Sequence, residues 1–244
     1  MAISTQSIRE IVTAQSSAAV VLQRFDIDLC SRANSSLDQV CSELQLSVDQ
    51  ILQKLEEAAN GDGAAPVNFE SYSLSRLIQH IVRTHHQYVR RELPRLAQMA
   101  HKVAGKHGER APELIAVEKM LDQLRAEMFA HLQKEEQVLF PFISQMDQDP
   151  IAACSTSRGC FRTVALPVSM MIAEHESAED LVAEMRDLTR EFTPPDWACP
   201  TNIALHAGLR EFAADLRQHV HLENDLLFPR AVELEAELNR RSKR

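Results

Sequence analysis

Several features that would assign this chain to a broad class are missing from its 244 residues. No apolar run approaches the roughly 20 residues that a membrane-spanning helix needs, and the N-terminus lacks the charged and apolar regions of a signal peptide. No block of basic residues offsets the net charge of −9, which argues against nucleic acid or an anionic membrane as a partner. We therefore expect a cytoplasmic protein that binds neither.

The cysteines also lack the spacing of a structural framework. They are odd in number and contain no C-x-x-C pair, so they fit neither a disulfide framework nor a zinc knuckle. Reduced thiols are expected at Cys30, Cys41, Cys154, Cys160 and Cys199. No H-E-x-x-H metalloprotease motif occurs, and no segment shows the alternation of a β-strand over a useful length.

What the chain does have is helical periodicity, with 45% apolar residues to build a core. From residue 73 onward, four segments carry apolar residues three and four positions apart. They run from Leu74 to about Ala104, from about Glu113 to Ser144, from just after Pro167, and from about Thr201 to Leu238, and Pro94 is expected to kink the first. Four amphipathic helices joined by loops predict an all-α fold, an antiparallel four-helix bundle over residues 73–244.

Residues 1–60 predict a small helical N-terminal domain that carries Cys30. Helices are expected over Ile8–Leu22, over Leu37–Leu44, and from a capping box at Ser47 through Ala58. Such a unit is too small to be robust alone, so it should dock on the rest of the chain or pair with a second copy in a homodimer. Residues 61–72, which begin with a glycine-rich stretch ending in a proline, are interpreted as the linker.

Two stretches of the predicted bundle share the pattern H-x-x-x-E-x-x-x-L-F-P. The first contains His131 and Glu135, and the second, 88 residues later, contains His219 and Glu223. An α-helix turns once every ~3.6 residues, so a His and a Glu four apart lie on one face. In both stretches that face continues the apolar stripe and should be buried. Two buried carboxylates without partners are costly, and a metal ion is the simplest compensation.

The residues after each His–Glu pair are expected to pack in the core. Val138 and Leu226 continue the apolar stripes at the next turn. The repeated Leu-Phe-Pro is interpreted as core packing followed by a proline, Pro141 or Pro229, that ends the helix.

Two further histidines lie on the apolar stripes of the other two helices. His86 precedes His131 by 45 residues and His175 precedes His219 by 44, so the chain looks like one helix pair used twice. A single histidine on an apolar stripe is more often a hydrogen-bonded core residue than a ligand, but the duplicated His–Glu pairs favour a metal. His85 points about 100° away from His86 by helical geometry and is the competing ligand.

Together these residues match what two iron ions inside a helix bundle require. The six groups are His86, His131, Glu135, His175, His219 and Glu223. Imidazoles serve as terminal ligands, carboxylates can bridge, and two histidines per metal leave positions open for a diatomic molecule. Glu127, one turn before His131, and Glu174, beside His175, are candidates for orienting ligands or handling protons, although surface carboxylates are the commoner case. No catalytic residue is predicted beyond the metal site.

At these positions the chain resembles the hemerythrin-like di-iron proteins for the repair of iron centres. The resemblance spans nearly the whole chain and rests on residues 85–94, 131–141, 173–176 and 219–230. It implies that the same six residues hold two non-haem iron ions, with Glu135 and Glu223 as carboxylate bridges and room for an oxo bridge. It also implies a role linked in bacteria to nitric oxide and oxidative stress, with iron–sulfur proteins as partners.

The N-terminal unit is similar to that family's small cysteine-bearing domain through residues 24–30 and 36–37. The family usually has two adjacent cysteines and two glycines here, whereas this chain reads Cys30-Ser31-Arg32-Ala33. These residues do not support a role that needs a vicinal thiol pair. Cys30 alone fits a thiolate ligand, a redox thiol or a core residue, and we favour the last.

Two functions are compatible with this ligand set. In the first, the protein binds nitric oxide at the open positions and either reduces it to nitrous oxide or supports the recovery of damaged iron–sulfur proteins. Two ferrous ions could hold two nitric oxide molecules close enough to couple. In the second, the protein is a binding module that turns nothing over: a nitric oxide or oxygen buffer, a sensor or an iron donor. The residues alone leave both open.

Overall fold

The structure is a computed structural model that describes residues 3–15, 18, 21–22, 25, 27, 32–59, 68–148 and 163–241. Its described residues are almost entirely helical, with one isolated antiparallel bridge between Ser7 and Ser36 and no strand. Among the helices in these ranges, none combines the length and the apolar character needed to cross a membrane. The predicted all-α class is therefore confirmed.

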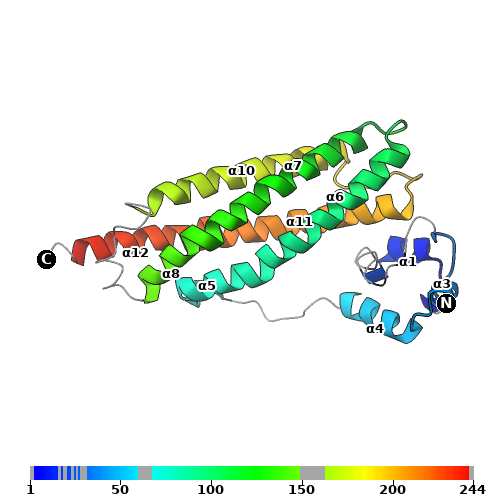
Figure 1. Ribbon diagram of the computed structural model, residues 1–244, viewed down its shortest axis with the longest axis horizontal. Coiled ribbons are helices and arrows are strands. Elements are labelled where there is room, and N and C mark those ends of the chain that lie inside the picture. The colour runs from blue at the N-terminus through cyan, green and yellow to red at the C-terminus, as the bar shows by residue number, and fades with distance from the viewer. Residues whose placement is uncertain are drawn as a thin grey trace. The chain divides into compact units, whose positions relative to one another are not determined.

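Four long helical stretches run in alternating directions and form the predicted antiparallel bundle (Figure 1). Hydrogen bonds between side chains connect them around the ring, from first to second, second to third, third to fourth and fourth to first. The first stretch is α5 (Leu74–Ile81), the turn η3 (Val82–His86) and α6 (Gln87–His107); the second is α7 (Glu113–Lys134), η4 (Glu135–Leu139) and α8 (Phe140–Gln148); the third is α10 (Ala165–Leu188); the fourth is α11 (Pro200–His221), η5 (Leu222–Leu227) and α12 (Phe228–Arg241).

The chain divides into two compact units. One comprises Met1–Ala65, Arg95–Lys119 and Met185–Glu211, and the other comprises Pro66–Pro94, Met120–Glu184 and Phe212–Arg244. The second unit has a core of buried apolar side chains from all four stretches, including Leu77, Ile143, Met171 and Leu222. All six predicted metal ligands belong to this second unit. The domain division predicted at residues 60 and 73 stays a prediction.

Near the N-terminus the structure contains η1 (Ile3–Thr5), α1 (Ile8–Ala14), α3 (Leu37–Leu44) and α4 (Val48–Ala59), and η2 (Phe69–Ser71) precedes α5. Capping boxes at Ser7 and Ser36 start α1 and α3, and the predicted helix over Leu37–Leu44 is confirmed. The single helix predicted over Ile8–Leu22 is wrong. It stops at Ala14 because Gln15 adopts an extended backbone, with φ −139° and ψ 105°. The predictions for Cys30 and Ser31 lie outside the described residues.

Three of the four stretches contain a π-helical turn that the sequence did not reveal. The N–H groups of Gln87, Phe140 and Phe228 each donate to a carbonyl five residues earlier, instead of four. A π turn accommodates one extra residue, so it rotates every later side chain relative to the preceding α-helix.

This rotation corrects two predictions about the core. Val138 is 37% exposed, and it is the next residue, Leu139, that is buried. In the second repeat Leu227 is fully buried, while Leu226 only packs against the edge of the core. The apolar stripe shifts by one residue because each π turn adds one.

The prolines do not end the helices as predicted. Pro141 and Pro229 lie in the first turns of α8 and α12, directly after the π turns. There the backbone hydrogen bonds change from five-residue to four-residue spacing. A missing N–H group is tolerated at such a point. Pro167 likewise lies in the first turn of α10, which begins at Ala165 and not after Pro167 as predicted. Pro94 lies within α6, which continues to His107.

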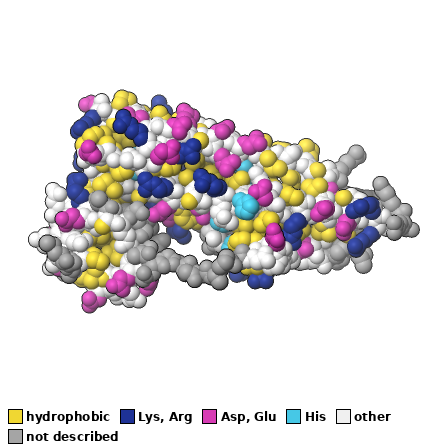
Figure 2. Space-filling view, turned by 180° about the vertical axis from the view of Figure 1, so that it is seen from behind, with side chains coloured by type: hydrophobic (Ala, Val, Ile, Leu, Met, Phe, Trp, Pro, Cys, Tyr) yellow, Lys and Arg dark blue, Asp and Glu magenta, His cyan; other side chains and the backbone are white. Residues whose placement is uncertain are grey.

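The outer faces of the helices carry charges of both signs. On the face shown in Figure 2, Lys and Arg side chains are interspersed with Asp and Glu. This distribution is typical of the solvent-facing side of amphipathic helices.

Gly208 marks a close approach between α11 and α6. A Cβ atom added there would lie 2.6 Å from Leu96 Cδ2 and 3.1 Å from the Arg95 guanidinium, and the Leu96 side chain is fully buried. We expect Gly208→Ala to lower the free energy of unfolding by about 1–3 kcal/mol, because overpacking outweighs the gain in helix propensity. Denaturant unfolding measures this change.

Gly105 in α6 provides the matched control. A Cβ atom added there meets nothing within 4 Å, so Gly105→Ala should stabilise the protein by up to about 1 kcal/mol. Equal stability of the two variants would show that the helices can separate at Gly208 without cost.

Candidate metal centre

The structure brings the six predicted ligands together inside the bundle. Each of the four stretches contributes, through His86 of η3, His131 of α7, Glu135 of η4, His175 of α10, His219 of α11 and Glu223 of η5. Every one of these residues is at most 3% exposed. Three of the six lie in π turns, a feature often found at functional sites.

The six side chains form two groups of four that share both carboxylates. His86 and His219 complete one group, and His131 and His175 complete the other. In each group, one ligand atom from every residue lies within 4.8 Å of the others. Each group therefore takes one histidine from each half of the internal repeat, a pairing across the repeat that the sequence did not indicate.

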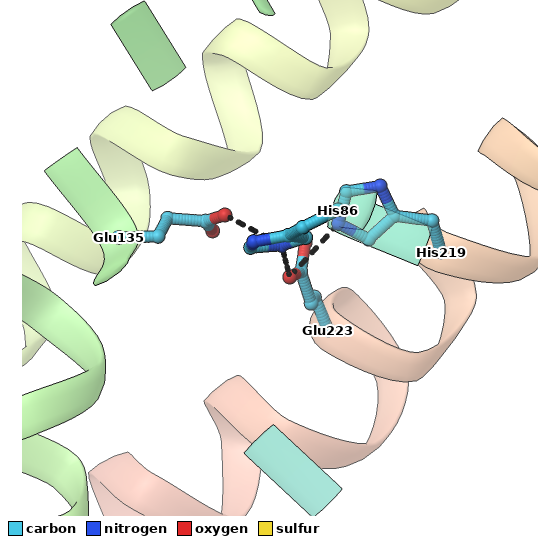
Figure 3. A group of neighbouring side chains, drawn as sticks. All are labelled: His86, Glu135, His219 and Glu223. Carbon is cyan, nitrogen blue, oxygen red and sulfur yellow. Dashed lines mark hydrogen bonds and ion pairs between the residues drawn. The ribbon is translucent and has the colours of Figure 1, made fainter. Parts of the chain in front are cut away.

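The carboxylates lie between the two histidine pairs. In the first group the His86 ring lies between Glu135 and Glu223 (Figure 3). Glu223 uses a different oxygen for each group: its Oε1 is 3.0 Å from His219 Nε2, and its Oε2 is 3.0 Å from His175 Nε2. This is the arrangement that a carboxylate bridging two ions requires.

Glu135 also faces both groups. Its Oε2 lies 3.4 Å from His86 Nε2 and 3.3 Å from His131 Nε2. The second carboxylate thus lies between histidines that belong to different groups.

Acceptors on the outer side orient three of the four imidazole rings. The Nδ1 atoms of His86, His131 and His175 lie 2.7, 2.9 and 2.9 Å from oxygens of Glu136, Glu174 and Asn224, respectively. An Nδ1–H that donates outward leaves the lone pair of Nε2 directed inward. These acceptors fix the rings in the tautomer that ligates through Nε2.

Glu136 and Asn224 are outer partners that the sequence reasoning missed. Each directly follows one of the shared carboxylates, Glu135 or Glu223. The repeated position after each glutamate was the signal that could have found them. In both repeats, the residue at this position accepts a hydrogen bond from a histidine of a neighbouring stretch.

The donor set fits a bound cation. The Nε2 atoms of His131 and His175 are only 3.0 Å apart, and with both Nδ1 atoms donating outward their lone pairs would face each other. Within the described ranges, His86 Nε2 and both oxygens of Glu135 are buried without a hydrogen-bond partner. A buried carboxylate left unpaired costs several kcal/mol. A cation between these atoms would satisfy all of them.

The electrostatics also favour positive charge. Burial opposes charging of the imidazoles, but the carboxylates of Glu135 and Glu223 outweigh it and raise the pKa of His131 to about 9. The same competition raises the pKa of His86 and of His175. Burial pushes the Glu223 pKa upward, yet the surrounding histidines hold that pKa well below its usual range. A metal ion in place of the protons would gain the same interactions.

The remaining predicted residues have different surroundings. Glu174 accepts from His131 and forms an ion pair with Lys134. Glu127 is exposed and is hydrogen-bonded by Gln123. A pocket of about 240 Å³ beside His131 is lined by both glutamates. His85, the competing ligand, belongs to neither group.

The bundle and its two buried His–Glu groups define a helical cation-binding protein of the hemerythrin type. The family profile described as the hemerythrin HHE cation binding domain matches residues 77–231. A second profile, described as a domain of unknown function (DUF542), matches residues 4–59.

Proteins similar in sequence to this chain narrow the class of cation-binding protein. The chain is 32% identical over 237 residues to a probable iron–sulfur cluster repair protein of Haemophilus influenzae, covering 95% of this chain and 99% of the relative. It is 32% identical over 232 residues to the iron–sulfur cluster repair protein YtfE of Enterobacter sp., with 95% and 99% covered. It is 33% identical over 229 residues to YtfE of Yersinia pseudotuberculosis, with 93% and 96% covered. The chain therefore belongs to the hemerythrin-domain family of iron–sulfur cluster repair proteins.

The outer acceptor Glu136 yields a prediction about metal affinity. Glu136→Leu removes the group that orients the His86 ring, and we expect metal affinity to fall by about 10–100-fold. Glu136→Gln keeps an acceptor oxygen and should recover most of the affinity. Competition with a chelator measures both.

Glu118→Leu is the matched control, because Glu118 also accepts from a histidine Nδ1, that of His101, but at the surface. It should leave metal affinity unchanged. An equal loss in Glu118→Leu and Glu136→Leu would show that the effect does not come from the orientation of His86.

Proposed function

We propose that this chain is a cytoplasmic non-haem di-iron protein of the nitrosative and oxidative stress response, which binds nitric oxide and supports the repair of iron–sulfur centres. The observation that carries the proposal is the pair of buried four-residue groups sharing Glu135 and Glu223. The relatives add the biological setting through their name, iron–sulfur cluster repair proteins. The hemerythrin HHE match supports iron as the cation.

The proposed ligand assignment follows the two groups. His86 and His219 hold one ion, His131 and His175 hold the other, and the two glutamates bridge them. Imidazole and carboxylate together suit iron, and a site with two histidines per ion leaves coordination positions open. When bound, the two ferrous ions would supply those open positions and one electron each.

The chain's own residues set the conditions for this chemistry. The two glutamates hold the metal positions close together, so two small molecules bound there would be near each other. The buried ligands exclude bulk water, and the pocket beside His131 is large enough for a diatomic molecule. Reducing two nitric oxide molecules to nitrous oxide and water consumes two electrons and two protons, so repeated turnover also needs an external electron donor.

Iron content tests the site. Wild type should bind about two irons per chain, and Glu135→Ala/Glu223→Ala should lose both, because neither metal position keeps a carboxylate. Metal analysis with an optical spectrum measures this. Glu127→Ala, an exposed glutamate one turn before His131, is the control and should retain both irons. Undisturbed iron in the double variant would contradict the proposed site, and zinc or manganese in wild type would remove the nitric oxide chemistry.

Anaerobic addition of nitric oxide to the reduced, iron-loaded protein tests the activity. Binding should change the optical spectrum, and reduction should release nitrous oxide. With excess reductant, an enzyme continues to produce nitrous oxide, whereas a buffer, sensor or iron donor stops at the amount set by its iron. Neither a spectral change nor nitrous oxide would refute the nitric oxide role while leaving the metal site intact.

A further inference from the structure

The ligand His219 differs from the other three histidines in how its ring is held from outside. His86, His131 and His175 each have an oxygen acceptor at Nδ1. The Nδ1 of His219 is buried and has no hydrogen-bond partner among the residues described. A different interaction must therefore fix the orientation of this ring.

The internal repeat shows which residues occupy the equivalent outer positions. Glu174 directly precedes His175 and accepts from His131. The residue that directly precedes His86 is His85. At the position where one half of the centre has a carboxylate acceptor, the other half therefore has an imidazole.

A second equivalent position completes the comparison. Glu127 lies four residues before His131, and Asp215 lies four residues before His219. Glu127 is exposed. Asp215 is mostly buried instead, and its Oδ1 lies 2.9 Å from the Nδ1 of His85.

The His85 ring lies against His219. The two rings are nearly parallel, with an interplanar angle of 4° and centroids 5.6 Å apart, an offset arrangement that is favourable for ring pairs. His80 also packs edge-on against His85, with centroids 6.0 Å apart. The His85 side chain is 5% exposed. The His85 ring is therefore buried, in contact with both rings and hydrogen-bonded to Asp215.

Packing alone does not explain this pair. The second carboxylate oxygen of Asp215, Oδ2, is buried without a hydrogen-bond partner in the described part of the chain. An apolar side chain of similar size would avoid that desolvation cost. The presence of a carboxylate here points to its contact with His85.

We propose that His85 and Asp215 are positioning residues for His219. Asp215 fixes the plane of the His85 ring, and the stacked ring restricts rotation of His219, so that His219 Nε2 stays directed at Glu223 Oε1, 3.0 Å away. The stack takes the place of the Nδ1 acceptor that the other three histidines have. This inference rests on the proposed di-iron function and adds the residues that orient one of its ligands.

Stepwise metal affinity is the direct test. Fe(II), and Zn(II) as an ion without redox chemistry, are titrated into metal-free protein against a competing chelator. In His85→Ala and Asp215→Leu we expect one of the two ions to bind about 10–100-fold more weakly, and the other to bind as in wild type. In iron-loaded protein, Mössbauer spectra should show a changed environment for one iron of the two.

Conservative variants separate positioning from folding. Asp215→Asn retains an oxygen that can accept from His85 and should keep near-wild-type affinity. His85→Phe retains the flat ring without its bond to Asp215 and should lie between wild type and His85→Ala. These two variants carry the test if His85→Ala fails to fold, which melting of the metal-free protein would reveal.

His221→Ala is the matched control. His221 is two residues from His219 and its Nδ1 lies 2.6 Å from Asp225 Oδ2, but this pair is exposed. Its removal should leave both affinities unchanged. Wild-type affinities in both His85→Phe and Asp215→Leu, or an equal loss in His221→Ala, would overturn the positioning role. A wild type that binds no metal would instead refute the proposed function.

Discussion

The whole centre depends on two carboxylates buried where water cannot solvate them. Glu135 and Glu223 are fully buried and lie between four imidazoles. Each charge is tolerated because Nε2 atoms converge on it, and at His86, His131 and His175 outer acceptors turn Nε2 inward. A bundle core of apolar side chains alone would be easier to form. The arrangement is therefore suited to binding a cation.

The π turns reconcile this centre with helical geometry. In a regular α-helix a residue and its immediate neighbour point about 100° apart, yet Glu135 faces the centre while Glu136 reaches the outer side of His86. The extra residue in η4 and η5 rotates the later turns, so that Leu139 and Leu227 take up the core positions. Each π turn lacks the regular four-residue backbone hydrogen bonds of an α-helix. That loss is concentrated at the segments that supply His86, Glu135 and Glu223.

Periodicity and repetition in the sequence were enough to predict the bundle and to bring the six candidate ligands into view. The His–Glu spacing is a local property of one helix, so the sequence could display it. Which histidines share a group is set by how the four stretches pack, and no spacing within one helix reveals that. The π turns were hidden because Val138 and Leu139 are both apolar, as are Leu226 and Leu227, and either register fills the stripe.

The repeat that builds both His–Glu groups also gives them different surroundings. On the His131 side, Glu174 pairs with Lys134 beside a pocket. On the His219 side, His85 and Asp215 stand at the positions equivalent to Glu174 and Glu127, and the His85 ring stacks on His219. A duplicated motif therefore does not imply duplicated function. The shared carboxylates make the two groups alike in charge, and the outer residues make their surroundings unlike, so a small molecule entering from the pocket would meet His131 first.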